Sequence, residues 1–208
     1  MKVGILGSGD VAQALGRAFA ARGHDVKLGT RDPKKLEAWA GQTRGTVGSF
    51  ADAARHGEVV FLCTLGSAAE QVLDLAGAAN VQGKVLVDVT VPLDFSKGMP
   101  PGLFVGTTDS LGERVQRKVP GAKVVKAFCT APNVRMANPG VPGARLPVAG
   151  DDPAAKQRVE AIAKELGWSG VLDLGGLDGA RWMEAFVPMW VRACIAQGRW
   201  DLVLDFRA

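Results

Sequence analysis

The sequence predicts an α/β fold in which helices cover both faces of a parallel sheet. Stretches of strand length alternate with stretches of helical periodicity along the first 140 residues, and this alternation requires right-handed crossovers between parallel strands. Residues 58–64 contain a continuous apolar run, as expected for a central strand that is covered on both faces. A glycine turn joins the first strand to the first helix. These observations predict a doubly wound sheet of the Rossmann type.

Six strands are expected in the first part of the chain, at residues 3–6, 25–31, 45–48, 58–64, 84–89 and 124–128. Helices are expected between them, and two of their starts carry a capping signal. Asp32 precedes a proline, and Ser110 with Glu113 forms a capping-box pattern. The helix between the first two strands buries one face that contains Leu15 and Phe19.

The pattern changes beyond about residue 140. A strand at 145–150 is followed by a helix that begins at Asp152, a strand at 170–174 and a last helix at about 178–197. The helix after Asp152 has one apolar face, made of Ala155, Val159, Ile162 and Leu166. We expect residues 1–140 to form the main domain and residues 141–208 to form a small C-terminal annex, packed together as a single compact unit.

A dinucleotide-binding turn is predicted where the first strand ends. Gly7 permits a tight turn, and Gly9 lets the backbone approach a pyrophosphate. The first turn of the next helix offers unpaired N–H groups and the positive end of a helix dipole to that anion. Ala12 takes the place of the third glycine and still allows close packing of helix on strand. A glycine turn without a ligand is the weaker alternative in this context.

The end of the second predicted strand favours NADP(H) over NAD(H). Arg31 supplies a planar fork of donors suited to a phosphate, Thr30 adds a hydroxyl, and Lys34 or Lys35 follows on the next helix. Asp32 is the alternative, as the carboxylate that binds ribose in an NAD site, but its position before a proline predicts an N-cap. The main domain is therefore expected to bind NADP(H).

Composition excludes several classes of protein. The net charge is +4 and the basic residues are spread along the chain, without the basic stripe that nucleic-acid binding requires. The apolar runs are too short for a signal peptide or a membrane span, so we expect a cytoplasmic protein. The three cysteines are far apart and lie in apolar surroundings, which predicts reduced thiols and no metal site.

Acid–base groups are scarce where a substrate is expected. The chain has no tyrosine, which excludes the Tyr-x-x-x-Lys site of short-chain dehydrogenases. His24 and His56 lie in loops that enter strands, away from the edge where ligands bind. Lys126 and Asp88 remain, and for Lys126 the more ordinary interpretation is a stem packed on the sheet with its head in water. We assign no catalytic residue and expect hydride transfer to an acceptor that supplies its own chemistry, such as a flavin or deazaflavin ring.

Several motifs occur in one order: Gly7-Ser8-Gly9-Asp10, then Gly29-Thr30-Arg31, then residues 88–93, residues 124–130 (VVKAFCT), and Leu174-Gly175-Gly176-Leu177 leading to Arg181 and Glu184. Together they resemble the NADP-dependent deazaflavin (coenzyme F-420) reductase family, which includes the NADPH-oxidising domain of the six-transmembrane metalloreductases. The resemblance covers most of the chain. It implies an NADPH-dependent oxidoreductase that transfers hydride between NADP(H) and a deazaflavin or flavin.

The resemblance also implies site residues. Ser8, Thr30, Arg31 and Lys35 match the 2′-phosphate positions, and residues near 64–65 and 92 match the path toward the nicotinamide. Cys129 departs from the family pattern, since relatives commonly carry Asn there, and its apolar setting favours an inert packing residue. The predicted cofactor-binding residues are Gly7, Ser8, Gly9, Asp10, Val11, Thr30, Arg31, Lys35, Thr64, Leu65 and Pro92. The substrate candidates are Lys126, Phe128, Cys129 and Asn133, with the ring acceptor expected between residues 126–133 and 174–181.

Two other functions stay open at this point. One is a non-catalytic NADP(H)-binding module that senses the redox state of the pool, and the other is a small imine or carbonyl reductase with Lys126 as proton donor. The last helix carries Trp182, Phe186, Met189 and Trp190, more apolar surface than a small annex is expected to cover, which predicts a homodimer. The alternative is that these side chains are core or the wall of a second pocket.

Overall fold

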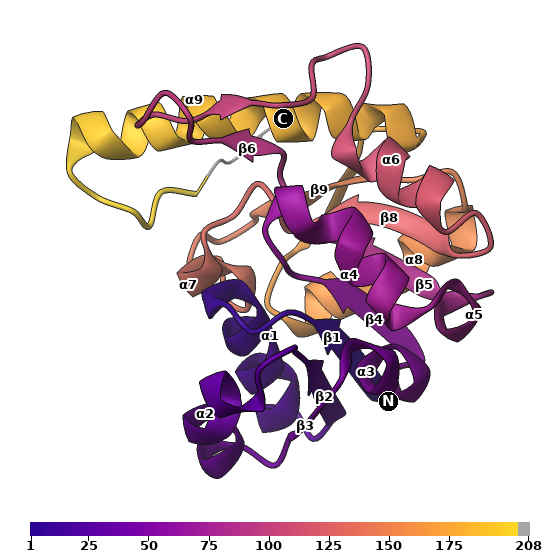
Figure 1. Cartoon of the computed structure of the whole chain (residues 1–208). Helices are drawn as coiled ribbons and strands as arrows, with labels where there is room; N and C mark the ends of the chain where they lie inside the picture. Colours follow the sequence, from indigo (N-terminus) through magenta and orange to yellow (C-terminus); the bar gives the residue numbers. More distant parts are fainter. Residues whose placement is uncertain (204–208) are drawn as a thin grey trace.

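The computed structural model describes residues 1–203 (Figure 1). In this part of the chain eight strands form one sheet: β1 Lys2–Leu6, β2 Asp25–Gly29, β3 Thr46–Gly48, β4 Val59–Leu62, β5 Val85–Asp88, β8 Lys123–Ala127, β9 Arg145–Ala149 and β10 Gly170–Asp173. Their order is β10-β9-β8-β5-β4-β1-β2-β3. The six strands expected before residue 140 are therefore all present, and they are parallel to one another.

Helices cover both faces of this sheet, as predicted. Along β4, Val59 and Phe61 belong to one apolar core while Val60 and Leu62 belong to another, because successive side chains of a strand point to opposite faces. The first core is closed by α1 Asp10–Ala21, α2 Glu37–Gln42, α7 Asn133–Met136 and α8 Pro153–Glu165. The second is closed by α3 Phe50–His56, α4 Ala69–Ala76, α5 Ala78–Val81 and α6 Leu111–Lys118.

The C-terminal strands depart from the parallel pattern. β9 runs antiparallel to β8, with Lys126 opposite Ala149, and β10 is parallel to β9. For β9 to be parallel to β8, the chain would have to return to the end of the sheet at which β8 begins, through a long crossover. Between β8 and β9 it forms only the short α7, so β9 starts near the end of β8 and runs in the opposite direction. The sheet is therefore largely parallel, and it continues across residue 140. The division at that residue into domain and annex stays a prediction.

The predicted helix starts are confirmed at three positions. The carboxylate of Asp32 accepts the N–H of Lys34 at the start of a 3-10 helix, η1 Pro33–Leu36, and that of Asp152 accepts the N–H of Ala155. The hydroxyl of Ser110 accepts the N–H of Glu113. The helix α3 was missed, although Ser49 and Asp52 form a full capping box there.

The last helix, α9 Ala180–Gln197, lies across the top of the molecule and runs on through Pro188. Besides η1, the described part of the chain has two short 3-10 helices, η2 Gly66–Ala68 and η3 Leu177–Gly179, and η3 leads directly into α9. A small hairpin of β6 Leu93–Asp94 and β7 Gly102–Leu103 lies alongside it (Figure 1). Among the described residues, none of the helices combines the length and apolar character needed to span a bilayer.

Candidate functional site

The turn between β1 and α1 has the shape that anion binding requires. Gly7 has a φ of 152°, and a Cβ there would lie 2.0 Å from the carbonyl oxygen of Cys63. Gly9 is the N-cap of α1 and offers no side chain to the N–H groups of the first turn. A Cβ at Gly9 would meet nothing within 4 Å. The backbone of this turn therefore faces open space with helix N–H groups available, as a pyrophosphate site requires.

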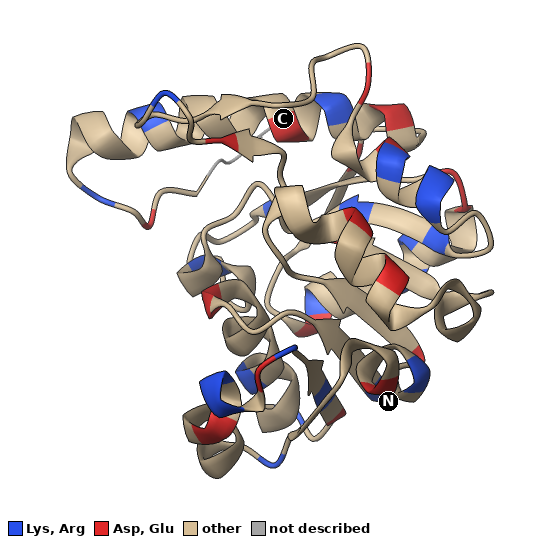
Figure 2. Ribbon diagram, in the orientation of Figure 1, with Lys and Arg blue, Asp and Glu red and all other residues tan. Residues whose placement is uncertain are grey.

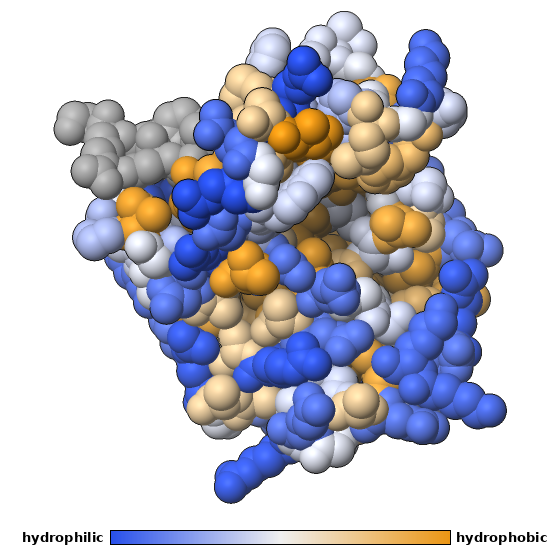
Figure 3. Space-filling model, turned by 90° about the vertical axis from the view of Figure 1, so that its left-hand side faces the viewer, coloured by the Kyte–Doolittle hydropathy of each residue, from blue (hydrophilic) through white to orange (hydrophobic). Residues whose placement is uncertain are grey.

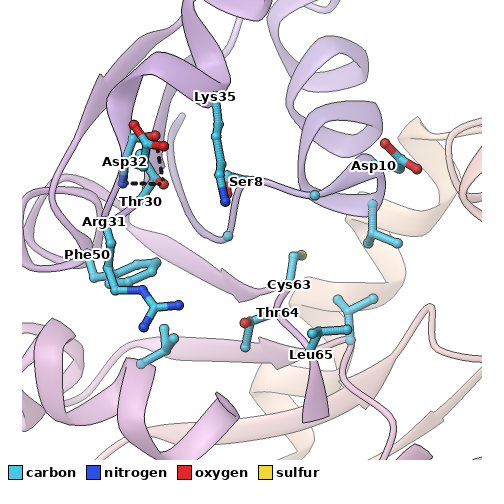
Figure 4. A pocket seen from close by; sticks show the side chains of 15 residues that line it. Ser8, Asp10, Thr30, Arg31, Asp32, Lys35, Phe50, Cys63, Thr64 and Leu65 are labelled. Carbon is cyan, nitrogen blue, oxygen red and sulfur yellow. Dashed lines mark hydrogen bonds between the residues drawn. The ribbon is translucent and has the colours of Figure 1, made fainter. Parts of the chain in front are cut away.

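A cavity of about 520 Å³ opens at this turn (Figure 4). All of the predicted cofactor-binding residues line it except Pro92, together with Asp32, Phe50, Cys63, Val72 and Val89. Pro92 is buried, and its carbonyl accepts the N–H of Phe104. Asp32 directly follows Arg31, and Phe50 begins α3. Cys63, Val72 and Val89 carry no recognisable motif, because they reach the cavity only through the packing of β4 and β5 beside β1.

Two cations lie at one end of this cavity. Figure 4 shows Lys35 extending toward Ser8, with the guanidinium of Arg31 on the side of Phe50. The hydroxyl of Thr30 accepts the N–H of Asp32 at 3.1 Å and donates to its carbonyl. The Asp32 carboxylate is occupied as an N-cap, as the sequence predicts. Two cations and a carboxylate already used as an N-cap favour the 2′-phosphate of NADP(H) over the two ribose hydroxyls of NAD(H) at this end of the cavity.

A second, smaller cavity of about 230 Å³ adjoins the first, and the two share Thr64, Leu65 and Val89. The remaining lining residues are Gly66, Ser67, Thr90, Val91, Leu93 and Phe95. None of them carries a charge, and Leu65, which lines both spaces, is 73% exposed. We call this second cavity the apolar cleft.

The position of Lys126 differs from the expected one, in which its stem packs on the sheet and its ammonium reaches water. Its side chain is 0% exposed, so its head does not reach water. The ammonium lies 2.9 Å from Oδ2 of Asp88 and 2.7 Å from Oε1 of Glu184, and it also donates to the carbonyl of Thr90. Burial alone would lower the pKa of Lys126, but the two carboxylates outweigh it and hold the pKa above its ordinary value. A lysine that holds its proton this firmly is a poor catalytic acid.

The other substrate candidates lie outside both cavities. Phe128 is fully buried, with a φ of 64°, and packs near Phe61. Cys129 is buried, and burial raises the pKa of its thiol to about 12, which fits the inert packing residue that the sequence favours. Asn133 begins α7 and its side chain accepts the N–H of Val134.

Neither segment expected to enclose the acceptor lines a cavity described above. Residues 174–177 lie beside β9, where Leu174 donates to the carbonyl of Val148 and Gly150 donates to that of Gly175. This is the far edge of the sheet from β1 and β2. The antiparallel turn of β9 places them there, which the alternation of elements did not reveal.

Both histidines lie away from the two cavities, although His56 ends α3 and is not in the loop that the sequence predicts. His24 contacts Glu165 at 2.6 Å, and His56 contacts Asp25, at the edge opposite the cavities. The three cysteines are free and buried. Within residues 1–203, no group of three His, Cys, Asp or Glu side chains is arranged to hold a metal ion.

Comparison with known proteins agrees with this geometry. Residues 2–92 match the family model described as "NADP oxidoreductase coenzyme F420-dependent". The chain is 30% identical to the F420-dependent NADP reductase of Methanocaldococcus jannaschii, over 92% of this chain and 91% of that protein. It is also 30% identical to Metalloreductase STEAP3 of Rattus norvegicus over 91% of this chain, and it spans only 38% of that longer protein.

Solved structures extend the similarity. A crystal structure of a putative F420-dependent NADP-reductase from Arthrobacter sp. FB24 superposes with a TM-score of 0.96 at 39% identity, over 100% of both chains. An imine reductase of Streptomyces aurantiacus, at 19% identity and a TM-score of 0.70 over 95% of this chain and 64% of that one, shares the fold alone. With its glycine turn, its cationic cavity and these full-length relatives, the chain belongs to the F420-dependent NADP oxidoreductase family.

Proposed function

We propose that this protein is an NADPH-dependent oxidoreductase that transfers hydride between NADP(H) and a planar ring, a deazaflavin or a flavin. The observation that carries the proposal is the pair of adjoining cavities. The larger has a glycine turn and cations suited to a dinucleotide phosphate, and the smaller is uncharged and apolar. A flat ring in the smaller space would face the inner end of the larger one.

The cofactor half of the proposal rests on the match between the lining residues and NADP(H). Gly7, Gly9 and the first turn of α1 would hold the pyrophosphate. Arg31, Lys35 and the hydroxyls of Ser8 and Thr30 would hold the 2′-phosphate, with charge-assisted hydrogen bonds from the two cations. Thr64 and Leu65 would lie along the path to the nicotinamide, with Pro92 behind the wall formed by Val91.

The acceptor half rests on the apolar cleft. Leu65, Val91, Leu93 and Phe95 supply apolar and aromatic surface for a ring, and Thr64 and Ser67 supply hydroxyls for its polar edge. We place the ring here in preference to the space between residues 126–133 and 174–181, since those segments line neither cavity. Lys126, Phe128, Cys129 and Asn133 would then act from behind the site and not by contact with the substrate.

The chemistry asked of the chain is mainly positioning. NADPH, when bound, would supply the hydride, and the reduced ring would take its proton from solvent without a donor from the protein. Leu65 and Val89, which line both cavities, would set the separation of the two rings. Hydride transfer requires an approach of about 3–3.5 Å. With a ring bound, the apolar surface of the cleft would keep water from that contact.

Stopped-flow mixing of the protein and NADPH with coenzyme F-420, with free flavins, and with a panel of small imines and carbonyls tests the proposal. We expect turnover with a deazaflavin or a flavin. Fast turnover of an imine or carbonyl that Lys126→Met abolishes would contradict it and favour the reductase that uses a lysine. Tight NADPH binding without turnover of any acceptor would favour the redox-sensing module.

We also propose that the protein works as a homodimer in the cytoplasm. Trp182 and Met189 are 64% and 61% exposed on α9, and Figure 2 shows that most of this helix carries no charge. In Figure 3 apolar side chains gather on the upper part of the molecule, near α9. A second copy covering this face would remove them from water. Three free thiols are typical of a reducing compartment.

A further inference from the structure

A cluster of three ionisable side chains is buried behind the apolar cleft, and the proposed hydride transfer does not use it. It consists of Lys126 on β8, Asp88 at the end of β5 and Glu184 on α9, with exposures of 0%, 0% and 2%. We call it the buried ion cluster. Glu184 also accepts the N–H groups of Leu111 and Gly112 at 2.9 and 3.0 Å, so the start of α6 joins it.

The buried ion cluster holds one residue of the cleft from three sides. Oδ1 of Asp88 accepts both the N–H of Thr90, at 2.9 Å, and its hydroxyl, at 2.6 Å. The carbonyl of Thr90 accepts from Lys126. Every polar group of Thr90 is therefore fixed by the cluster, and the side chain is 2% exposed.

Thr90 belongs to a segment, residues 89–91, that lines the apolar cleft. Val89 lines both cavities, and Thr90 and Val91 line the apolar cleft. Gly66, which also lines the cleft, packs directly on this segment, because a Cβ on Gly66 would lie 2.1 Å from the carbonyl oxygen of Val91. A small movement of residues 89–91 would therefore change the width of the cleft.

We propose that Lys126, Asp88 and Glu184 are positioning residues that fix residues 89–91 and thereby the separation between the cofactor and the acceptor. Burying three ionisable groups costs free energy that well-packed apolar residues would not. The hydrogen bonds of Asp88 and Lys126 that compensate part of this cost converge on Thr90 in the cleft wall. The inference rests on the proposed function for its effect on catalysis, but its effect on the wall can be measured without turnover.

The kinetic test uses Thr90→Val, which keeps the shape and removes the hydroxyl bonded to Asp88, and Thr90→Ser, which keeps the hydroxyl. We expect Thr90→Val to lower kcat/KM for the ring acceptor about five- to twentyfold, with the Kd of NADPH changed by less than about twofold. Thr90→Ser should restore most of the loss. Asp152→Ala, which removes the N-cap of α8 away from both cavities, is the control for lowered stability.

Hydrogen exchange tests the wall itself. Lys126→Met leaves two buried carboxylates without a cation, so it is measured beside the neutral variant Asp88→Asn, Lys126→Met, Glu184→Gln. We expect amide exchange at residues 89–91 to accelerate about tenfold or more in the neutral variant, relative to β1 and β2 in the same protein. Asp152→Ala should show no such local change.

Turnover of a ring acceptor tests the proposed function, and amide exchange at residues 89–91 tests the positioning role separately. A wild-type protein that reduces no ring would contradict the proposed function, while exchange at residues 89–91 would still decide whether the cluster holds the wall. Unchanged exchange there, or equal losses of NADPH affinity and acceptor kcat/KM in Thr90→Val, would overturn the positioning role.

Discussion

Arg31 is the side chain on which the choice between NADPH and NADH depends. It is exposed at the end of β2 and lines the larger cavity. Arg31→Ala should raise the KM for NADPH about ten- to a hundredfold, because it removes a charged hydrogen bond worth about 1.5–3 kcal/mol. The KM for NADH, which lacks the phosphate, should change little. Steady-state kinetics with both cofactors measures this, and equal losses would contradict the assignment.

Two neighbouring lysines supply a matched comparison. Lys34 and Lys35 are both exposed in η1, but only Lys35 lines the cavity. Lys35→Ala should weaken NADPH binding about three- to tenfold, since it removes one screened cation near a phosphate. Lys34→Ala should leave binding unchanged. Fluorescence titration of NADPH checks both variants, and a larger effect from Lys34 would place the phosphate elsewhere.

Glu184 should make the stability of the fold depend on pH. Its burial raises the pKa of the carboxyl despite the nearby Lys126, with Asp88 adding to the increase. A carboxyl whose pKa is raised by folding stabilises the fold fully below the unfolded pKa, and this contribution is lost as the pH rises through the folded value. The Tm of Glu184→Gln, relative to wild type, should therefore increase as the pH rises above about 4.5, the ordinary pKa of the carboxyl. Thermal unfolding across this range measures it, and a relative decrease would show that Glu184 ionises more readily when folded.

At the scale of the element, the turn between β1 and α1 contains one glycine that binding of NADPH should require and another that the stability of the fold should require. Gly9 has φ and ψ values that alanine adopts, and its Cβ position is open. Gly9→Ala should leave the Tm unchanged or slightly higher and weaken NADPH binding about tenfold or more, because the methyl group would occupy the space of the pyrophosphate. Differential scanning calorimetry and NADPH titration measure the two effects.

Gly7 is the control within the same turn. A Cβ at Gly7 would overlap the carbonyl of Cys63, and its φ of 152° strains any other residue. Gly7→Ala should lower the free energy of unfolding by about 3 kcal/mol or more. A Gly9→Ala variant as unstable as Gly7→Ala would show that Gly9 is also held by packing.

At the scale of the whole molecule, α9 decides whether the chain is a monomer or a dimer. Trp182 and Met189 are seven residues apart and lie on one face of the helix. Sedimentation equilibrium should show a dimer at micromolar concentration. Trp182→Glu with Met189→Glu should give a folded monomer, because a charge at the centre of an apolar interface is costly. A wild-type monomer at that concentration would contradict the proposed dimer.

Much of the fold and half of the site could be predicted from the sequence. The glycine turn, the N-caps Asp32 and Asp152, and the alternation of strands and helices depend on residues within a few positions of one another. Backbone conformation, capping and periodicity act over that range. Those signals place Gly7, Gly9, Thr30 and Arg31 at one cavity without reference to any distant residue.

The tertiary structure alone decided the rest. Lys126 lies 38 residues from Asp88 and 58 from Glu184, and its environment depends on where α9 crosses the sheet. The direction of β9 depends on how the chain turns after Phe128, and residues 174–181, which follow β10 beside β9, line neither cavity. The apolar cleft joins residues from the ends of β4 and β5. Such contacts depend on packing between elements far apart in the chain, for which no local pattern exists.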